Sequence, residues 1–122
     1  MRQKILLVED EESIRDMYVF KLNGSDYDVK IAENGKVGLH LASEWHPDLI
    51  LLDIMMPVMN GGVMLEKLRA EEWGASIRVI ILTNLSKSEA PTVLRFLNVD
   101  RYIVKAHSTP KEVIKVIQDI LD

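Results

Sequence analysis

Short apolar runs alternate along the whole chain with segments of helical periodicity, and this alternation restricts the fold more than any other feature. The apolar runs are residues 4–8, 28–32, 49–52, 79–82 and 102–104. Each run is followed by a segment whose apolar residues recur every three or four positions, as on one face of an α-helix. Five strand-helix units in succession are typical of an α/β domain, with a parallel sheet covered by helices on both faces.

The helical segments have identifiable limits. We expect helices over residues 13–22, 34–43 and 63–70, a fourth that opens at residues 86–89, and a last one from Pro110 toward the C-terminus. Near-continuous apolar strands support a sheet that is buried on both faces, because parallel strands rarely meet solvent.

Capping signals mark the last two helices. Thr109 and Glu112 have the spacing of a capping box, and Pro110 occupies the first helical position between them. For the fourth helix we favour Ser88 as the N-cap, because Pro91 would then stand in the first turn, where proline is tolerated. Both helices are therefore expected to begin at defined residues.

Length and charge narrow the function. The chain has 122 residues, of which 48% are hydrophobic, so it fits one domain with a core of its own. It has no cysteine, which excludes disulfides and thiolate chemistry. With 15 basic and 19 acidic residues the net charge is −4, and no basic block occurs. We therefore expect no direct contact with nucleic acid.

The two ends of the chain bear on location and domain count. The first apolar run is too short for a signal-peptide core or a membrane span. We expect a cytoplasmic protein without membrane attachment. The last helical pattern continues almost to Asp122, so residues 1–122 are expected to form a single domain with no output domain in this chain.

Polar side chains stand where four of the expected strands end. Glu9 and Asp10 follow the first run, Asp53 the third, Thr83 the fourth and Lys105 the fifth. The carboxyl ends of parallel strands lie at one edge of a sheet, and ligands bind in the crevice outside that edge. We expect these five side chains to meet in one small site.

The chemistry of that set points to phosphoryl transfer. Three neighbouring carboxylates repel one another, and a divalent cation relieves the repulsion. Mg²⁺ prefers carboxylate oxygens, together with waters and a phosphate. An ammonium and a hydroxyl beside such a metal suit a phosphoryl group, and one carboxylate can itself be the nucleophile, which gives an acyl phosphate.

Four segments together resemble the response-regulator receiver domain of two-component signalling: LLVEDEES, LLDIMMPVMNG, VIILTN and YIVKAHSTP. The resemblance extends over the whole chain. It implies a flavodoxin-like (βα)5 fold, a doubly wound five-stranded parallel sheet in the order 2-1-3-4-5. It also implies a Mg²⁺-dependent domain that accepts a phosphoryl group from a sensor histidine kinase or a histidine phosphotransfer protein. Such a domain signals by changing conformation, and is not an enzyme acting on other substrates.

The resemblance assigns a role to each polar residue at the acidic end of the site. Asp53 matches the phosphoacceptor. Asp10 matches the acidic residue that binds Mg²⁺ directly, and Glu9 matches its neighbour, which acts through a water. The backbone carbonyl of Met55 and the Asp53 carboxylate would complete the protein ligands of the metal.

The remaining positions match the residues that sense phosphorylation. Lys105 would bind a phosphoryl oxygen and Thr83 would turn its hydroxyl toward the phosphoryl group. Tyr102 matches the aromatic switch residue, which turns inward when Thr83 moves. If phosphorylation promotes a homodimer, we expect the interface on the face formed by the fourth helix, the last strand and the last helix.

Two departures from the family pattern carry expectations. Ala106 follows Lys105 where the family usually has a proline after a cis bond, and we expect a trans peptide here because a cis bond before alanine costs about 3 kcal/mol. Met55 and Leu85 occupy the two variable positions that often tune hydrolysis, and both are apolar. Because neither can orient an attacking water, we expect a long-lived acyl phosphate.

Three other classes of protein are less consistent with these residues. An aspartyl-phosphate phosphatase usually has a second aspartate two residues after the nucleophile, and Met55 stands there. A flavin-binding domain needs a phosphate-cradling loop after the first strand, and EDEES is acidic. A receiver-like scaffold or binding module that is never phosphorylated would not need Asp53, Asp10 and Lys105 together.

Overall fold

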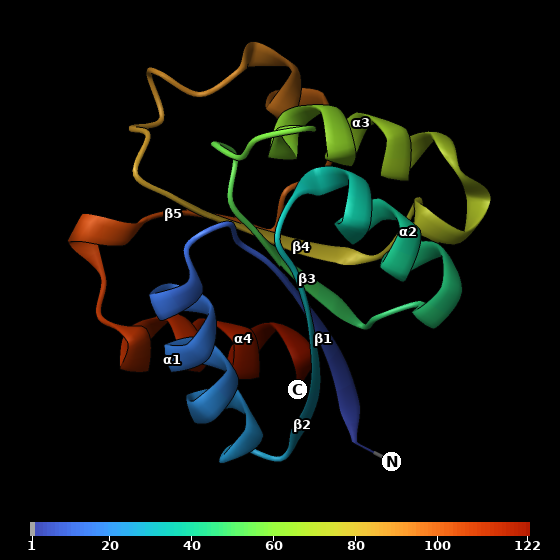
Figure 1. The fold of residues 1–122 in the computed structure, drawn as a ribbon. Helices are drawn as coiled ribbons and strands as arrows, with labels where there is room; N and C mark the ends of the chain where they lie inside the picture. Colours follow the sequence, from blue (N-terminus) through green and yellow to red (C-terminus); the bar gives the residue numbers. More distant parts are fainter. Residues whose placement is uncertain (1) are drawn as a thin grey trace.

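The structure is a computed structural model that describes residues 2–122, and its centre is a five-stranded parallel sheet (Figure 1). The strand order is β2-β1-β3-β4-β5, which confirms the expected topology. The strands are β1 (Gln3–Val8), β2 (Tyr27–Ala32), β3 (Leu49–Leu52), β4 (Arg78–Thr83) and β5 (Arg101–Val104).

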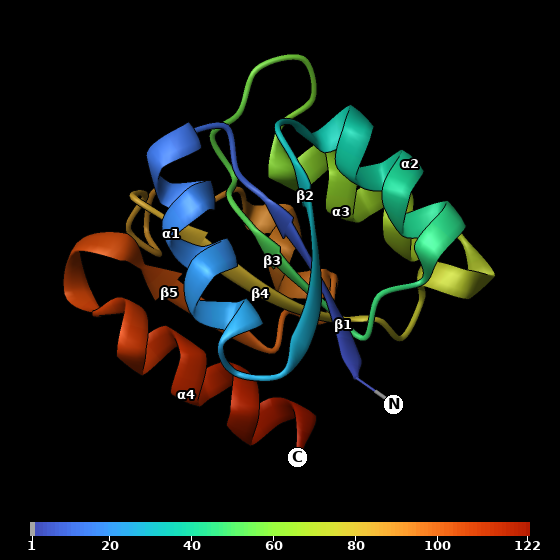
Figure 2. The same ribbon diagram turned by 60° about the horizontal axis from the view of Figure 1, so that its bottom comes forward.

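Helices cover both faces of the sheet, as Figures 1 and 2 show. On one face lie α1 (Glu12–Asn23) and α4 (Pro110–Leu121), and on the other lie α2 (Gly35–Trp45) and α3 (Gly61–Ala70). Three short 3-10 helices complete the chain: η1 (Glu72–Gly74), η2 (Thr92–Phe96) and η3 (Lys105–His107). None of the helices within the described chain is long and apolar enough to cross a membrane.

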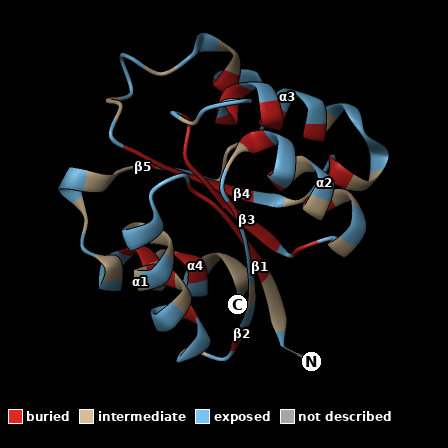
Figure 3. Ribbon diagram, in the orientation of Figure 1, coloured by how far each residue is buried: buried red, intermediate tan, exposed pale blue. Residues whose placement is uncertain are grey.

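The first strand shows how one sequence supplies two cores. Ile5 and Leu7 pack toward α1 and α4, whereas Leu6 and Val8 pack toward α2 and α3. Successive side chains of a strand point to opposite faces, so an unbroken apolar run fills both layers. Figure 3 shows the buried residues concentrated in the strands and on the inward sides of the helices. The apolar runs thus end where the strands are no longer covered by helices on both faces, and the polar residues follow at that point.

The prediction of a fourth helix that opens at residues 86–89 is wrong. No α-helix opens at residues 86–89, and the only helical turn between β4 and β5 is the 3-10 helix η2. Ser86 instead forms a local turn, in which its N–H and its hydroxyl both donate to the Glu89 carboxylate, at 3.0 and 2.8 Å. Pro91 then has φ −56° and ψ 132°, an extended conformation that cannot continue a helix. The residue before a proline is also disfavoured in the α region.

The capping box at the start of α4 is confirmed and carries a prediction. The Thr109 hydroxyl accepts a bond from Glu112 N at 3.2 Å, and Thr109 N donates to the Glu112 carboxylate at 3.0 Å. Thr109→Ala should therefore lower the free energy of unfolding by about 1 kcal/mol, the usual cost of losing an N-cap. Urea denaturation measures this change. Thr109→Ser keeps the acceptor and should stay near wild type, and an equal loss in both variants would contradict the capping role.

Candidate functional site

Asp53 lies one residue beyond β3 and is almost completely buried, at 5% exposed. Its N–H donates to Val8 O at 3.0 Å, which ties it to the end of β1. One carboxylate oxygen accepts from Met55 N at 3.3 Å, and the other accepts from Lys105 Nζ at 3.2 Å. The charge that ends the apolar run is thus held by specific partners at the carboxyl edge of the sheet.

Glu9 is equally buried, at 2% exposed, directly after β1. Its N–H donates to Ala32 O at 3.0 Å, which extends the pairing with β2. Its carboxylate accepts from Glu11 N at 3.2 Å and forms an ion pair with Lys105 Nζ at 2.6 Å. A buried carboxylate is costly unless its oxygens are bonded, and here both oxygens are bonded.

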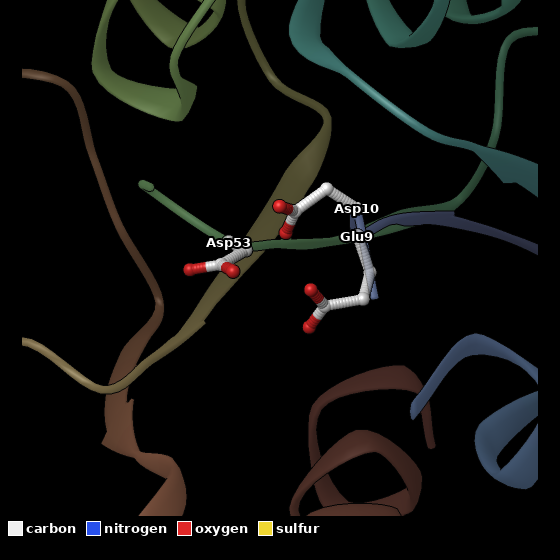
Figure 4. Close-up of side chains that lie close together, drawn as sticks. All are labelled: Glu9, Asp10 and Asp53. Carbon is white, nitrogen blue, oxygen red and sulfur yellow. The ribbon is translucent and has the colours of Figure 1, made fainter. Parts of the chain in front are cut away.

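Asp10 completes an acidic cluster that fits a metal. One carboxylate oxygen from each of Glu9, Asp10 and Asp53 lies within 4.8 Å of the others. Figure 4 shows the Asp10 carboxylate directed toward Asp53, with the Glu9 carboxylate below them and turned to the same side. Oxygen donors at this separation suit Mg²⁺. Met55 N bonds to Asp53, which brings the Met55 backbone to the cluster, and its carbonyl as a ligand stays a prediction.

The close approach of these charged groups shifts the pKa values of Glu9 and Lys105. Burial raises the pKa of the Glu9 carboxyl to about 7, the bond from Lys105 offsets part of this, and the Asp53 charge adds to it. Burial alone would lower the pKa of Lys105, but the bond to Glu9 and the charges of Asp53 and Glu9 outweigh it and raise that pKa. One ammonium therefore does not fully neutralise the carboxylates, and a divalent cation would favour their ionised forms.

Lys105 and Thr83 reach the same edge from β5 and β4. Lys105 begins η3, and its peptide bond to Ala106 is trans, as expected. Thr83 is the last residue of β4 and is fully buried. The register pairs Leu52 with Ile81, so Thr83 lies one residue beyond the position opposite Asp53. The Thr83 hydroxyl accepts a bond from Leu85 N at 3.4 Å.

Tyr102 is connected to Thr83 through the backbone of one residue, Leu85. The Tyr102 hydroxyl donates to Leu85 O at 2.8 Å and to Ser86 O at 3.2 Å. Because Leu85 also donates its N–H to Thr83, the two expected switch residues share the Leu85 backbone. Burial raises the pKa of the Tyr102 hydroxyl, and the charges of Glu89 and Asp53 add to this effect.

The structure adds a residue that the sequence did not reveal. Arg15, in α1, donates from Nη1 to the carbonyl oxygens of both Glu9 and Asp10, each at 3.0 Å. These two bonds fix the backbone that presents the acidic pair. Because arginine is common in the early part of a helix, the residue type alone does not indicate that Arg15 holds this backbone. Its position six residues after Glu9 is the only sign in the sequence.

The loop after Asp53 contains a strained residue that yields a second prediction. Val58 has φ 68°, which is rare for a β-branched residue, and its side chain is 77% exposed. The turn around it is closed by a bond from Met59 N to Pro57 O at 2.7 Å. Val58→Asn should stabilise the protein by about 1 kcal/mol, because asparagine adopts positive φ more readily.

Chemical denaturation of Val58→Asn beside Val63→Asn tests this expectation. Val63 is also an exposed valine, but it lies in α3 with helical geometry. Asparagine has no conformational advantage there, so Val63→Asn should be neutral or destabilising. Equal stability changes in the two variants would show that Val58 is not strained.

Comparison with known families matches this arrangement. The family model for the response regulator receiver domain matches residues 5–118. A probable transcriptional regulator, ycf27, of Porphyridium aerugineum is 39% identical over 121 residues, which cover 98% of this chain and 48% of that protein. The DNA-binding response regulator MtrA of Mycobacterium tuberculosis is 35% identical over 116 residues, covering 93% of this chain and 48% of MtrA. The chain thus spans about half the length of these curated relatives.

Solved structures agree with the fold. The chemotaxis response regulator CheY4 of Vibrio cholerae superimposes with a TM-score of 0.89 at 27% identity, covering 98% of this chain and 99% of CheY4. A CheY-like response regulator receiver domain of Methanospirillum hungatei gives 0.89 at 28% identity, covering 100% and 95% of the two chains. Family match, topology and the acidic edge of the sheet agree, and the chain belongs to the response regulator receiver domain family.

Proposed function

We propose that Asp53 is the residue that accepts the phosphoryl group. The observation that carries this assignment is a buried carboxylate beside both an ammonium, at 3.2 Å, and the acidic cluster. An Asp53 oxygen attacks phosphorus and forms an O–P bond. The P–N bond of a phosphohistidine donor breaks, and the imidazole leaves with the electron pair. The donor is a sensor histidine kinase or a histidine phosphotransfer protein.

Mg²⁺ is the cofactor that the site would hold. Glu9, Asp10 and Asp53 would supply side-chain oxygens, and Met55 its carbonyl. When bound, the metal supplies positive charge that offsets the charge of the phosphoryl oxygens. Lys105 binds one of those oxygens and keeps its charge, which its raised pKa supports.

The conformational signal would pass from Thr83 to Tyr102. Thr83 turns its hydroxyl toward the phosphoryl group and gives up its bond to Leu85 N. The Leu85 carbonyl also accepts the bond from the Tyr102 hydroxyl, so a shift of the Leu85 backbone alters the position of Tyr102. The domain then acts as a two-state switch whose equilibrium is biased by the added charge. Its chemistry is limited to its own phosphorylation and dephosphorylation.

The partners of the switch follow from its surface. We place the domain in the cytoplasm and assign it no direct nucleic-acid contact, which its net charge of −4 supports; the relatives named as DNA-binding are about twice as long. A homodimer would use η2, β5 and α4, since η2 takes the place of an α-helix between β4 and β5. Asp100, directly before β5, already bonds Arg78 at 3.2 Å and Val79 N at 2.9 Å, so it would contribute less to such an interface than its charge suggests.

Intact mass spectrometry after addition of acetyl phosphate, with and without Mg²⁺, tests the assignment. We expect one phosphoryl adduct that requires Mg²⁺ and is lost in Asp53→Ala. Asp16→Ala removes an exposed aspartate of α1 and should leave the adduct intact. An adduct that survives in Asp53→Ala would refute the assignment. No adduct in a folded wild-type protein would favour the receiver-like scaffold.

The lifetime of the phosphoryl group gives a third prediction. Met55 is exposed and Leu85 is half-buried, and neither side chain can hold a water in line for attack. After removal of the donor, Leu85→Gln should therefore lose its phosphoryl group faster than wild type, roughly severalfold, because an amide can position the water. Phosphate release followed over time measures both rates. A wild type that dephosphorylates as fast as the variant would contradict the expected long lifetime.

A further inference from the structure

Arg15 contacts Glu9 and Asp10 through their backbone and not through their carboxylates. Its Nη1 donates to Glu9 O and to Asp10 O, each at 3.0 Å. No ion pair between Arg15 and a carboxylate occurs within residues 2–122. The guanidinium matches the geometry of a carboxylate well, and an arginine beside acidic residues commonly pairs with one of them. Arg15 is therefore placed to hold the chain and not to neutralise the acidic cluster.

The turn between β1 and α1 leaves these two carbonyl oxygens outside regular structure. β1 ends at Val8 and α1 begins at Glu12, so neither oxygen has a partner in the sheet or in the helix. Within the described part of the chain, Arg15 is the only hydrogen-bond donor to either of them. Two carbonyl oxygens directed at one nitrogen repel each other, because the negative ends of their dipoles meet. A cationic donor between them offsets this repulsion and stabilises the turn in this shape.

The shape of this turn decides where the Asp10 side chain lies. The Glu9 and Asp53 carboxylates are each held by bonds from other residues. The Asp10 carboxylate, in contrast, is exposed and accepts no hydrogen bond from residues 2–122. It nevertheless lies in the acidic cluster, directed toward Asp53 (Figure 4). Because the rotamers open to a side chain depend on its backbone dihedral angles, the backbone of the turn is what places the Asp10 carboxylate.

Resting on the proposed function, we propose that Arg15 is a positioning residue for Mg²⁺: by holding the carbonyl oxygens of Glu9 and Asp10 together, it directs the Asp10 carboxylate into the metal site. Without Arg15 the two carbonyl oxygens move apart, and the Asp10 side chain samples other orientations. Binding of the ion must then also order this side chain, and the entropy lost in that ordering lowers the affinity. Arg15 thus acts on the metal through the backbone and without touching it.

Substitution of Arg15 separates positioning from a simple effect of charge. Arg15→Met keeps most of the aliphatic stem and removes the donors. It should bind Mg²⁺ about 10-fold more weakly than wild type, the lower end of the effect for residues that orient metal ligands. A role through charge alone has the opposite sign, because removing a positive charge near the site would tighten the binding of a cation.

Two further variants sharpen the comparison. In wild type a single nitrogen of Arg15 makes both bonds, and an ammonium carries three donors. Arg15→Lys should therefore bind Mg²⁺ with an affinity between those of wild type and Arg15→Met, since the lysine side chain is shorter by one bond. Lys21→Met is the matched control. It removes an exposed positive charge from the last turn of the same helix and should keep the wild-type affinity.

Isothermal titration of the four proteins with Mg²⁺, without any phosphoryl donor, measures these affinities. ¹³C NMR of the metal-free proteins gives a second readout: the backbone carbonyl resonances of Glu9 and Asp10 should shift in Arg15→Met and return toward their wild-type positions in Arg15→Lys.

The titration also distinguishes failure of the proposal from failure of the proposed function. Mg²⁺ binding by Arg15→Met that equals or exceeds that of wild type would overturn the positioning role alone, and so would a loss that Lys21→Met shares in full. A wild type that binds no Mg²⁺ would refute the proposed cofactor and the positioning role together.

Discussion

Gly61→Ala is expected to lower the free energy of unfolding by about 3 kcal/mol, the upper range for overpacking that only a backbone shift can relieve. A Cβ at Gly61 would collide with the backbone carbonyl oxygen of Asp53 and would lie 3.0 Å from Ile54 Cα. Gly61 N also donates to Ile54 O at 2.9 Å, which closes the loop after Asp53. The clash therefore displaces Asp53 itself, and Mg²⁺ affinity should fall together with stability.

The adjacent residue provides the control. Gly62 lies in the same helix turn, but the nearest atom to an added Cβ is the side-chain oxygen of Asn60, at 3.3 Å. Gly62→Ala should be neutral or slightly stabilising, because alanine is favoured over glycine inside a helix. Denaturant unfolding and Mg²⁺ titration of both variants measure the two effects. If Gly61→Ala and Gly62→Ala lowered the free energy of unfolding equally, the close approach of Gly61 to Asp53 would not be the reason that residue 61 must be glycine.

This pair of glycines also shows where sequence interpretation stops. The strands were predictable because residues such as Leu49–Leu52 are buried on both faces of the sheet, and an unbroken apolar run is the direct mark of that environment. The convergence of Asp53, Thr83 and Lys105 followed from the rule that parallel strands end at one edge. In contrast, the sequence gives no sign that Gly61 and Gly62 differ, because only their tertiary contacts distinguish them.

The failed prediction of a fourth helix has a similar cause. Residues 86–97 carry capping and apolar signals that are compatible with a helix. Which conformation forms was decided by competition between that helix and the local bonds of Ser86 with Glu89. In η2 only Leu94 is buried, so packing contributes little to favour a full helix. Helices gain most of their stability from a packed face, and the sequence did not show that this one lacked a packed face.

Lys105→Met is expected to destabilise the metal-free protein by about 2 kcal/mol at neutral pH. Removing one partner of a buried ion pair typically costs about 3–5 kcal/mol. The loss is smaller here because Glu9, whose pKa is raised to about 7, can take up a proton. Lys111→Met removes an exposed lysine of α4 and should change stability little. Thermal and urea unfolding in a chelator compare the two variants.

The origin of that loss can be isolated within the same site. If the cost comes from carboxylates without a counter-charge, then Glu9→Gln added to Lys105→Met should recover most of the stability, because one of the two buried charges is gone. Saturating Mg²⁺ should also recover stability in the single variant, since a ligand that binds only the folded state stabilises it by mass action. A loss that neither Glu9→Gln nor Mg²⁺ relieves would instead be a packing defect around the lysine stem. Lys105 would then stabilise the fold through the packing of its aliphatic stem, and not through the charge that its ammonium places beside Glu9 and Asp53.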